Sequence, residues 1–341
     1  RKHDSKSNEA MIKYFIIGVL SSAIMLYGMS IVFGETGGST LLVDIRRHII
    51  VHGTSTLLGV AIFLTIAGFA FKVSAVPFHF WTPDTYEGAP TPVTAFLSTA
   101  SKAGGFVALL TIIRYGFFPS QDSWEPVLWV LAAASIIFGN LVALRQTNIV
   151  RMLAYSSIAQ GGFILVPLAV AGDGGAARVS FEAVLIYLFI YAAMNLGAFA
   201  VVIAVARRTG SAEIESYAGL GTSGPGLAIT LTIFLFSLAG IPPFAGWFAK
   251  FVMFRAVLDA NSPSAITLGV IAALGSVVAF FYYAGVARKM WFHDPAPEAA
   301  VSPKAIPAAL TVAIGLCVTF TVVVGVYPQI VARIGELAFP I

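Results

Sequence analysis

The chain contains 341 residues, of which 58% are hydrophobic and 11% are charged, and its mean hydropathy is +0.89. Soluble domains contain about 25% charged residues, so this composition excludes a soluble protein and predicts an all-α polytopic membrane protein. In such a protein, the net charge of +4 is related to which loops face the cytoplasm, and it does not indicate a nucleic-acid partner. Cys317 is the single cysteine, which excludes an intrachain disulfide and a thiolate-ligated iron–sulfur cluster.

Nine apolar segments are long enough to cross a bilayer, which takes about 20 residues of helix. They cover residues 11–33, 51–71, 91–113, 124–144, 152–171, 181–206, 227–258, 266–286 and 306–326. Since nine is odd, the two ends of the chain are expected on opposite sides of the membrane. Loops on the side of the N-terminal end contain more Lys and Arg than the other loops, which predicts that this side is cytoplasmic.

Two apolar stretches are too long for straight helices. Residues 51–81 and 227–258 would each form about 45 Å of helix, whereas the hydrocarbon core is about 30 Å thick. The first stretch contains Pro77, and the second contains Pro242 and Pro243. Proline removes a backbone donor and clashes with the preceding turn, so both helices are predicted to be broken within the membrane.

The two broken helices are the second and seventh spans, and they are therefore expected to cross the membrane in opposite directions. Interrupted helices at corresponding positions of two oppositely oriented halves are typical of an inverted-repeat transporter. The expected units are residues 1–120, with three helices of a first repeat, residues 121–290, with five helices of a second repeat, and residues 291–341, with a terminal helix and tail.

Three lysines lie in segments that are otherwise apolar. Lys72 precedes Pro77, Lys250 follows Pro243, and Lys102 lies in the third span within TAFLSTASKAGGFVALL. A lysine near the bilayer centre costs roughly 2.5–3.5 kcal/mol, so such residues usually mark a transport path or a proton relay. We predict that these lysines lie inside the membrane and carry protons. The alternative for each is snorkelling from a helix end or a static ion pair.

Other polar residues give weaker signals. Glu9 and Lys13 are spaced i, i+4, and an interfacial ion pair explains them about as well as a relay role. His79 is able to carry protons near neutral pH, or to serve as a hydrogen-bonded structural residue. Asp84 and Glu87 lie among turn-forming residues, which favours a solvated loop or a helix cap. The sequence contains no Walker motif and no zinc-spaced Cys or His cluster, so we expect no cofactor in this chain.

Five strings resemble a known family: SNEAMIKYFIIG, FKVSAVPFHFWTPDTYEGAPTPVTAFLS, STASKAGGF, RQTNIVRMLAYSSIAQGGF and FSLAGIPPFAGWFAKF. They are similar to the antiporter-like membrane subunits of proton-pumping NADH:quinone oxidoreductase, respiratory complex I. PDTYEGAPTPV resembles the subunit N branch rather than subunits M or L. The resemblance implies fourteen helices with two inverted repeats, so that the nine spans would be helices six to fourteen and the first five would be lacking.

The same resemblance implies site residues. Lys72 matches the lysine of the first broken helix, Lys102 the central lysine, and Lys250 the lysine of the second broken helix. Glu9 and Lys13 match a glutamate and a lysine of the sixth helix. The glutamate that partners the first lysine belongs to the family's fifth helix, and no residue here corresponds to it. We therefore expect this chain to be a piece of a longer subunit, or its first half-channel to be incomplete.

Function and partners follow from the resemblance as expectations. The chain would couple quinone reduction to proton translocation in the bacterial plasma membrane, as a subunit of an NADH:quinone oxidoreductase. Quinone, FMN and iron–sulfur clusters would lie in partner subunits, and the chain would contact subunit M, the small membrane subunits and lipid, but no nucleic acid. Two alternatives remain open at this point: a subunit of a cation/proton antiporter complex, and a purely structural subunit of the membrane arm.

Overall fold

The computed structural model describes residues 4–295 and 305–338. The helices in this part of the chain are α1 Ser5–Glu35, α2 Leu42–His52, α3 Thr56–Val73, α4 Trp81–Gly88, α5 Thr91–Phe96, η1 Leu97–Ser101, α6 Lys102–Ile112, η2 Ile113–Phe117, η3 Phe118–Ser120, α7 Gln121–Ala143, α8 Ile149–Leu168, α9 Ala177–Thr209, η4 Ile214–Tyr217, α10 Leu220–Ser223, α11 Pro225–Ala239, α12 Gly246–Ala260, α13 Pro263–Phe292, α14 Ala308–Val326 and α15 Gln329–Ala338.

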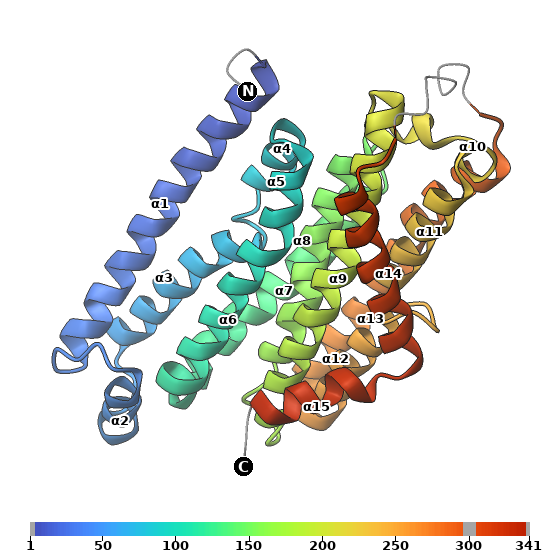
Figure 1. The fold of residues 1–341 in the computed structure, drawn as a ribbon. Helices are drawn as coiled ribbons and strands as arrows, with labels where there is room; N and C mark the ends of the chain where they lie inside the picture. The colour runs from blue at the N-terminus through green and yellow to red at the C-terminus, as the bar shows by residue number, and fades with distance from the viewer. Residues whose placement is uncertain (1–3, 296–304, 339–341) are drawn as a thin grey trace.

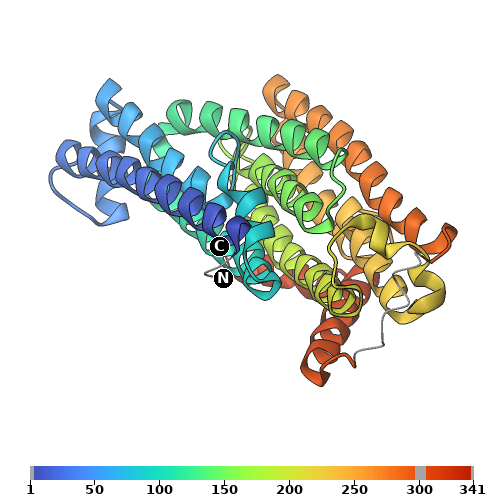
Figure 2. The same cartoon turned by 90° about the horizontal axis from the view of Figure 1, so that it is seen from above.

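The helices form an elongated bundle (Figure 1). Seen from above, α1 and α3 lie at one edge, and α13 and α14 lie towards the other (Figure 2). Helix α8 is almost completely enclosed, whereas α1 and α14 are mostly exposed. Large apolar side chains also remain exposed on the outside of the bundle, including Phe15, Leu26, Leu274 and Leu316. An apolar outer surface of this kind is what a lipid-facing bundle requires.

Seven helical segments in the described ranges are long and apolar enough to span a membrane. One of them is a run of 53 residues, Thr91–Ala143, which supplies two crossings because the chain reverses direction at η3. The halves of the second broken helix supply another crossing. Each of the nine predicted spans thus has a counterpart, and α1 begins at the end of the bundle opposite to α15, as expected for an odd number of crossings (Figure 1). The chain is a multi-pass membrane protein.

The first broken helix is made of α3 and α4, with residues 74–80 between them. Ser74 adopts a left-handed conformation with φ of 61°, and its N–H caps the end of α3. The break includes Pro77 as predicted, but the predicted start at residue 51 is wrong. Val51 belongs to α2, because Gly53 ends that helix with φ of 77° and Ser55 begins α3 by accepting a hydrogen bond from Leu58 N–H.

The second broken helix is made of α11 and α12, with residues 240–245 between them. Gly240 ends α11 in the left-handed region, with φ of 92°, where a side chain would be strained. Pro242 and Pro243 follow, so the predicted break is confirmed. Chain direction is opposite in the two broken helices, since α3 starts at the end of the bundle where α12 finishes (Figure 1).

Some local predictions are wrong. Asp84 and Glu87 lie in helix α4 rather than in a loop, and α2 occupies a stretch predicted as a connection. Helices of this length are shorter than a membrane span, so a criterion of apolar length does not detect them. Trp124 is fully buried at the start of α7, where its indole N–H donates to the carbonyl oxygen of Phe117 over 3.0 Å.

Candidate functional site

The site is a set of buried polar side chains on α6, α8, α9 and α12, in the middle of the bundle. Lys102 stands at its first end and is only 1% exposed. Five residues of π-helix, Leu97–Ser101, directly precede it. Single π-turns within α-helices often occur at functional positions, because the extra residue redirects the side chains that follow. Ser98 within this turn accepts a hydrogen bond from Asn195 of α9 over 2.8 Å, which holds the turn against the core.

Neutral groups surround the Lys102 ammonium. Its Nζ donates to the carbonyl oxygen of Ser157 over 2.8 Å and to the hydroxyl of the same residue over 2.7 Å. The Ser157 hydroxyl also accepts a hydrogen bond from Tyr191 of α9 over 2.9 Å. No carboxylate forms an ion pair with Lys102 within the described ranges. The cation is thus solvated by dipoles and not by a counter-charge.

Lys250 stands at the other end of the chain of polar groups, on α12, and is 6% exposed. It reaches back across the second break, and its Nζ donates to the carbonyl oxygen of Ala239 over 2.7 Å. Ala239 is the last residue of α11, so the ammonium lies at the negative end of that helix dipole. The Nζ also lies 4.7 Å from the ring centre of Phe163. Breaking the helix therefore creates the partner of this lysine.

Gln160 connects α8 to the second break. It follows Ser157 by one turn of α8, and its amide nitrogen donates to the carbonyl oxygen of Leu238 over 3.0 Å. That carbonyl is adjacent in the chain to the one that Lys250 binds. The amide oxygen of Gln160 accepts a hydrogen bond from Tyr187 over 2.8 Å. Polar groups on one face of α8 consequently extend from Lys102 to the break that holds Lys250.

A side branch leads from this face towards α7 and α13. The hydroxyls of Ser156 and Tyr283 are hydrogen-bonded, and Tyr282 donates to the side-chain oxygen of Asn140 over 3.1 Å. All four side chains are buried. Helices α7 and α13 thus join the helices around α8 that contribute buried polar groups.

The sequence analysis missed Ser157 and Gln160. A signal was present, because both lie in the otherwise apolar span 152–171, where a buried polar side chain is costly. Neither residue is charged, so neither stands out as the lysines do. Ser and Gln at a spacing of three residues also fit simple helix packing in a membrane, so the pattern by itself does not separate a relay from an interhelical contact.

Lys72 is in a different environment from the other two lysines. It lies in the last turn of α3, and its side chain is exposed on the outside of the described bundle. Its Nζ is 5.8 Å from the ring centre of Phe71. Its side chain is thus exposed, unlike those of Lys102 and Lys250, and its place inside the membrane and its proton-carrying role stay predictions. Its stem lies next to α6, because a β-carbon on Gly105 would be 3.1 Å from Cβ of Lys72.

His79 is buried in the first break, with 3% exposure. Its ring packs edge-on against Phe138 of α7, with ring centres 4.7 Å apart, and lies beside Phe80. Within the described ranges its Nδ1 has no hydrogen-bond partner, so aromatic packing holds the ring. The choice between a proton carrier and a structural residue stays a prediction.

A cluster of charges joins α1, α4 and α8 at the N-terminal end of the bundle. Lys13 binds Glu9 and Asp84, each at 2.5 Å. Arg151 binds Asp84 at 2.9 Å and Glu87 at 2.8 Å. Two carboxylates of α4 are therefore shared between cations of two other helices. This arrangement fixes the second half of the broken helix to its neighbours.

Helix α4 has eight residues and is not among the helices long enough to span a membrane, and the pKa values of its two carboxyls reflect this cluster. Burial acts to raise the pKa of Asp84, but hydrogen bonds from Lys13 and Arg151 outweigh it and lower the pKa. Burial likewise acts to raise the pKa of Glu87, and hydrogen bonds from Lys6 and Arg151 lower it. Because the folded state favours the ionised carboxylates, their stabilising effect is present above the ordinary carboxyl pKa and is lost as the pH falls through the lowered values.

We expect Asp84→Asn to lower the unfolding free energy by about 1–3 kcal/mol at pH 7, because two cations lose a charged acceptor. The difference between this variant and the original chain should disappear as the pH falls well below about 4, where Asp84 becomes neutral in both states. Thermal unfolding over a pH series measures both effects. Asp259→Asn is the control, since its pair with Arg255 is exposed and 3.7 Å long. A pH-independent difference would contradict the ion-pair explanation.

No group of three or more His, Cys, Asp or Glu residues in the described ranges is arranged to hold a metal ion. The hydrogen bonds of Lys102 and Lys250 to carbonyl and hydroxyl oxygens are compatible with movement of charge along hydrogen bonds. Buried lysines, hydroxyls and an amide are suited to that role.

Comparisons with known proteins place this chain in a family. The sequence model for the transmembrane subunits of NADH:quinone oxidoreductases and Mrp antiporters matches residues 1–276. The chain belongs to this family. A relative from Desulforamulus reducens, NADH-quinone oxidoreductase subunit N, is 44% identical over 338 residues, covering 99% of this chain and 68% of the relative. NAD(P)H-quinone oxidoreductase subunit 2 of Picosynechococcus is 44% identical over 317 residues, covering 92% of this chain and 59% of that relative.

Solved structures of the NADH:quinone oxidoreductase and Mrp antiporter family have the same fold. A chain of respiratory complex I from Thermus thermophilus with bound aureothin superposes with a TM-score of 0.81 at 30% identity, over 97% of this chain and 69% of that one. A chain of the Mrp complex from Dietzia has a TM-score of 0.83 at 23% identity, over 98% and 68%, and shows the fold alone. The chain thus spans about 59–69% of the length of these family members.

Proposed function

We propose that this chain is a proton-translocating membrane subunit of an NADH:quinone oxidoreductase, of the subunit N type, in a bacterial plasma membrane. The observation that supports this most directly is the buried path from Lys102 through Ser157 and Gln160 to the break that holds Lys250. Ionisable residues inside a membrane bundle are typical of proton relays. The names of the relatives support the enzyme class.

The relay role rests on how each lysine is solvated. Lys102 and Lys250 bind carbonyl and hydroxyl oxygens, so no fixed carboxylate in the described ranges neutralises either charge. A charge that moves nearby then changes the free energy of the ammonium strongly, because the interior screens electrostatic interactions weakly. A proton accepted at one lysine would be driven towards the other by such a movement. In this scheme Lys102 is the central relay, and Lys250 is the link to the exit or to the next subunit.

Lys72 is proposed as the gated site of the first half-channel. Its exposure on α3 allows a counter-charge from a packed segment or subunit to approach it, and α6 connects it to Lys102. Glu9, Lys13 and His79 have secondary roles in this scheme. We also propose the division into inverted repeats, residues 1–120 and 121–290, followed by the terminal residues 291–341.

Redox chemistry is assigned to neighbouring subunits. The quinone site, FMN and iron–sulfur clusters would belong to partners, and this chain would contact subunit M and the small membrane subunits. Energy released by quinone reduction would reach the chain as a movement of charge along the membrane arm. Solved family members are parts of multi-subunit membrane complexes, which supports an assembled partner set of this kind.

Replacing Gln160 with leucine tests the path itself. The variant removes the amide that joins α8 to Leu238, so we expect proton transfer between the lysines to slow by about tenfold or more. The measurement is the proton-to-electron ratio of the intact complex in proteoliposomes during NADH oxidation. Gln146→Leu is the control, because Gln146 is partly exposed beyond the end of α7.

The results separate the candidate functions. An unchanged ratio in Gln160→Leu with normal turnover would contradict the path. A purified complex that exchanges cations for protons but has no quinone reductase activity would favour a cation/proton antiporter. If the subunit is purely structural, Gln160→Leu would leave proton transport unchanged in every assay and would affect only the amount of assembled complex.

A further inference from the structure

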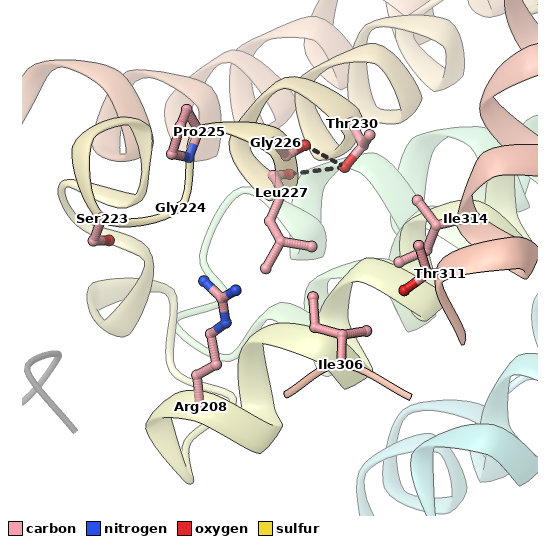
Figure 3. A pocket seen from close by; sticks show the side chains of 10 residues that line it. All are labelled: Arg208, Ser223, Gly224, Pro225, Gly226, Leu227, Thr230, Ile306, Thr311 and Ile314. Atoms are coloured by element: carbon pink, nitrogen blue, oxygen red, sulfur yellow. Dashed lines mark hydrogen bonds between the residues drawn. The ribbon is translucent and has the colours of Figure 1, made fainter. Parts of the chain in front are cut away.

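A cavity of about 480 Å³ lies away from the lysine path, between the end of α9, the start of α11 and the first part of α14. Figure 3 shows its lining, which includes Arg208, Gly226, Leu227, Ile306 and Ile314. The start of α11 lies at the end of the bundle where α1 begins (Figure 1). One cationic side chain thus faces apolar residues and three residues with hydroxyl groups, Ser223, Thr230 and Thr311.

The guanidinium of Arg208 projects into this cavity (Figure 3). Its Nε is buried and has no hydrogen-bond partner, and the described part of the chain supplies no carboxylate for it. A buried donor without an acceptor costs about 1–3 kcal/mol, so the residue is suited to an acceptor from outside. The planar fork of arginine matches the oxygens of a phosphate group.

Glycines leave room beside this cation. A β-carbon on Gly224 would lie 2.8 Å from Nη1 of Arg208, so the guanidinium rests against bare backbone. A β-carbon on Gly226 would meet no atom within 4 Å and would point into open space. Pro225 opens α11 and has no N–H, so the first peptide N–H of this helix that is able to bind an anion is that of Gly226.

The remaining lining and the surroundings suit a hydrocarbon chain. Leu227 and Ile314 are buried and form the apolar wall. Helix α14, which contains Ile314, also exposes the apolar side chains of Val312 and Leu316, with 60% and 68% exposure. Trp291, 40% exposed, lies against Gly221 of α10 and donates to Thr232 over 2.9 Å. A tryptophan at a helix end is typical of the depth of lipid headgroups.

From this geometry we propose that the cavity binds one anionic phospholipid. Its phosphate would accept hydrogen bonds from Arg208 and from the N–H of Gly226, and an acyl chain would follow Leu227 and Ile314 onto the outer surface of α14. The charge of the ligand matches the unpaired cation, and its chains match the apolar wall. Basic pockets between membrane helices are a recurrent type of lipid site. The site is independent of the proton path.

Photo-crosslinking tests this site in the intact complex. The complex is reconstituted in vesicles of phosphatidylcholine and phosphatidylglycerol at about 4:1, with a trace of phosphatidylglycerol that carries a diazirine in one acyl chain. Crosslinked peptides are then identified by mass spectrometry. We expect labelling in α11 near Leu227 and in α14 near Ile314, and we expect unlabelled phosphatidylglycerol to compete. Competition by inorganic phosphate at millimolar concentration would instead indicate a site for a small anion and would overturn the proposal.

Three variants separate this site from general attraction to an anionic surface. Arg208→Gln should reduce labelling about fivefold, the effect of one basic residue near such a surface. Arg207→Gln is the matched control, because Arg207 is adjacent and exposed but does not line the cavity, and its labelling should stay close to that of the original chain. Gly226→Leu fills the cavity without changing charge and should abolish labelling of α11 and α14. Equal effects of the two arginine variants, or unchanged labelling in a folded Gly226→Leu complex, would overturn the proposal.

Discussion

Lys102→Ala is expected to abolish proton translocation through this chain and to reduce coupled quinone reductase activity by about 10²-fold or more, the usual contribution of a proton-transfer group. Assembly should be largely retained, because the substitution removes a buried charge that has no carboxylate partner in the described ranges and thereby removes its desolvation cost. The measurements are the proton-to-electron ratio and the NADH:quinone reductase rate of the complex in sealed proteoliposomes.

Lys102→Arg separates charge from proton exchange. Arginine keeps the positive charge but does not release its proton under physiological conditions. We therefore expect this variant to assemble and to fail in translocation, as Lys102→Ala does. Arg255→Gln is the control, because Arg255 is exposed on the same helix as Lys250. A normal proton-to-electron ratio in both Lys102 variants would exclude this residue from the path.

Gly246→Ala is expected to have the largest effect on stability. A β-carbon at this position would lie 1.7 Å from the carbonyl oxygen of Ser237, where α12 crosses the end of α11. The N–H of Gly246 also donates to the hydroxyl of Ser237 over 3.0 Å. Backbone has to move to admit the methyl group, so we expect a loss of about 3 kcal/mol or more and failure of the second break to close.

Thermal unfolding of the purified complex and the amount of subunit in membranes report this effect. Gly315→Ala is the matched control, since a β-carbon on Gly315 would meet no atom within 4 Å in the middle of α14. The control should be neutral or slightly stabilising, because alanine favours helix more than glycine does. Unfolding of both Gly246→Ala and Gly315→Ala at the temperature of the original chain would contradict the close approach of Gly246 to the Ser237 carbonyl.

The lysines of the site were predictable because the free-energy cost of a charged side chain in an apolar span depends on its residue type. A lysine is expensive in any apolar span, so Lys102 and Lys250 stand out from the sequence alone. Burial of Ser157 and Gln160 costs less free energy than burial of a lysine, and small or polar residues of this kind also take part in ordinary helix packing. Their role depends on which residues of α6 and α11 face them across space. That pairing involves residues 55 and 78 positions apart in the chain.

Membrane class, the nine crossings and the two breaks were determined by the sequence alone, because a bilayer sets helix length and proline interrupts backbone hydrogen bonding locally. The tertiary structure decided which polar groups meet. It places Lys102 and Lys250 inside and Lys72 on the outer surface, although all three follow similar apolar sequence. It also converts Asp84 and Glu87 from apparent loop residues into the centre of an ion-pair cluster. Burial and ion pairing depend on neighbouring helices that are distant in the chain, and local sequence patterns do not identify those neighbours.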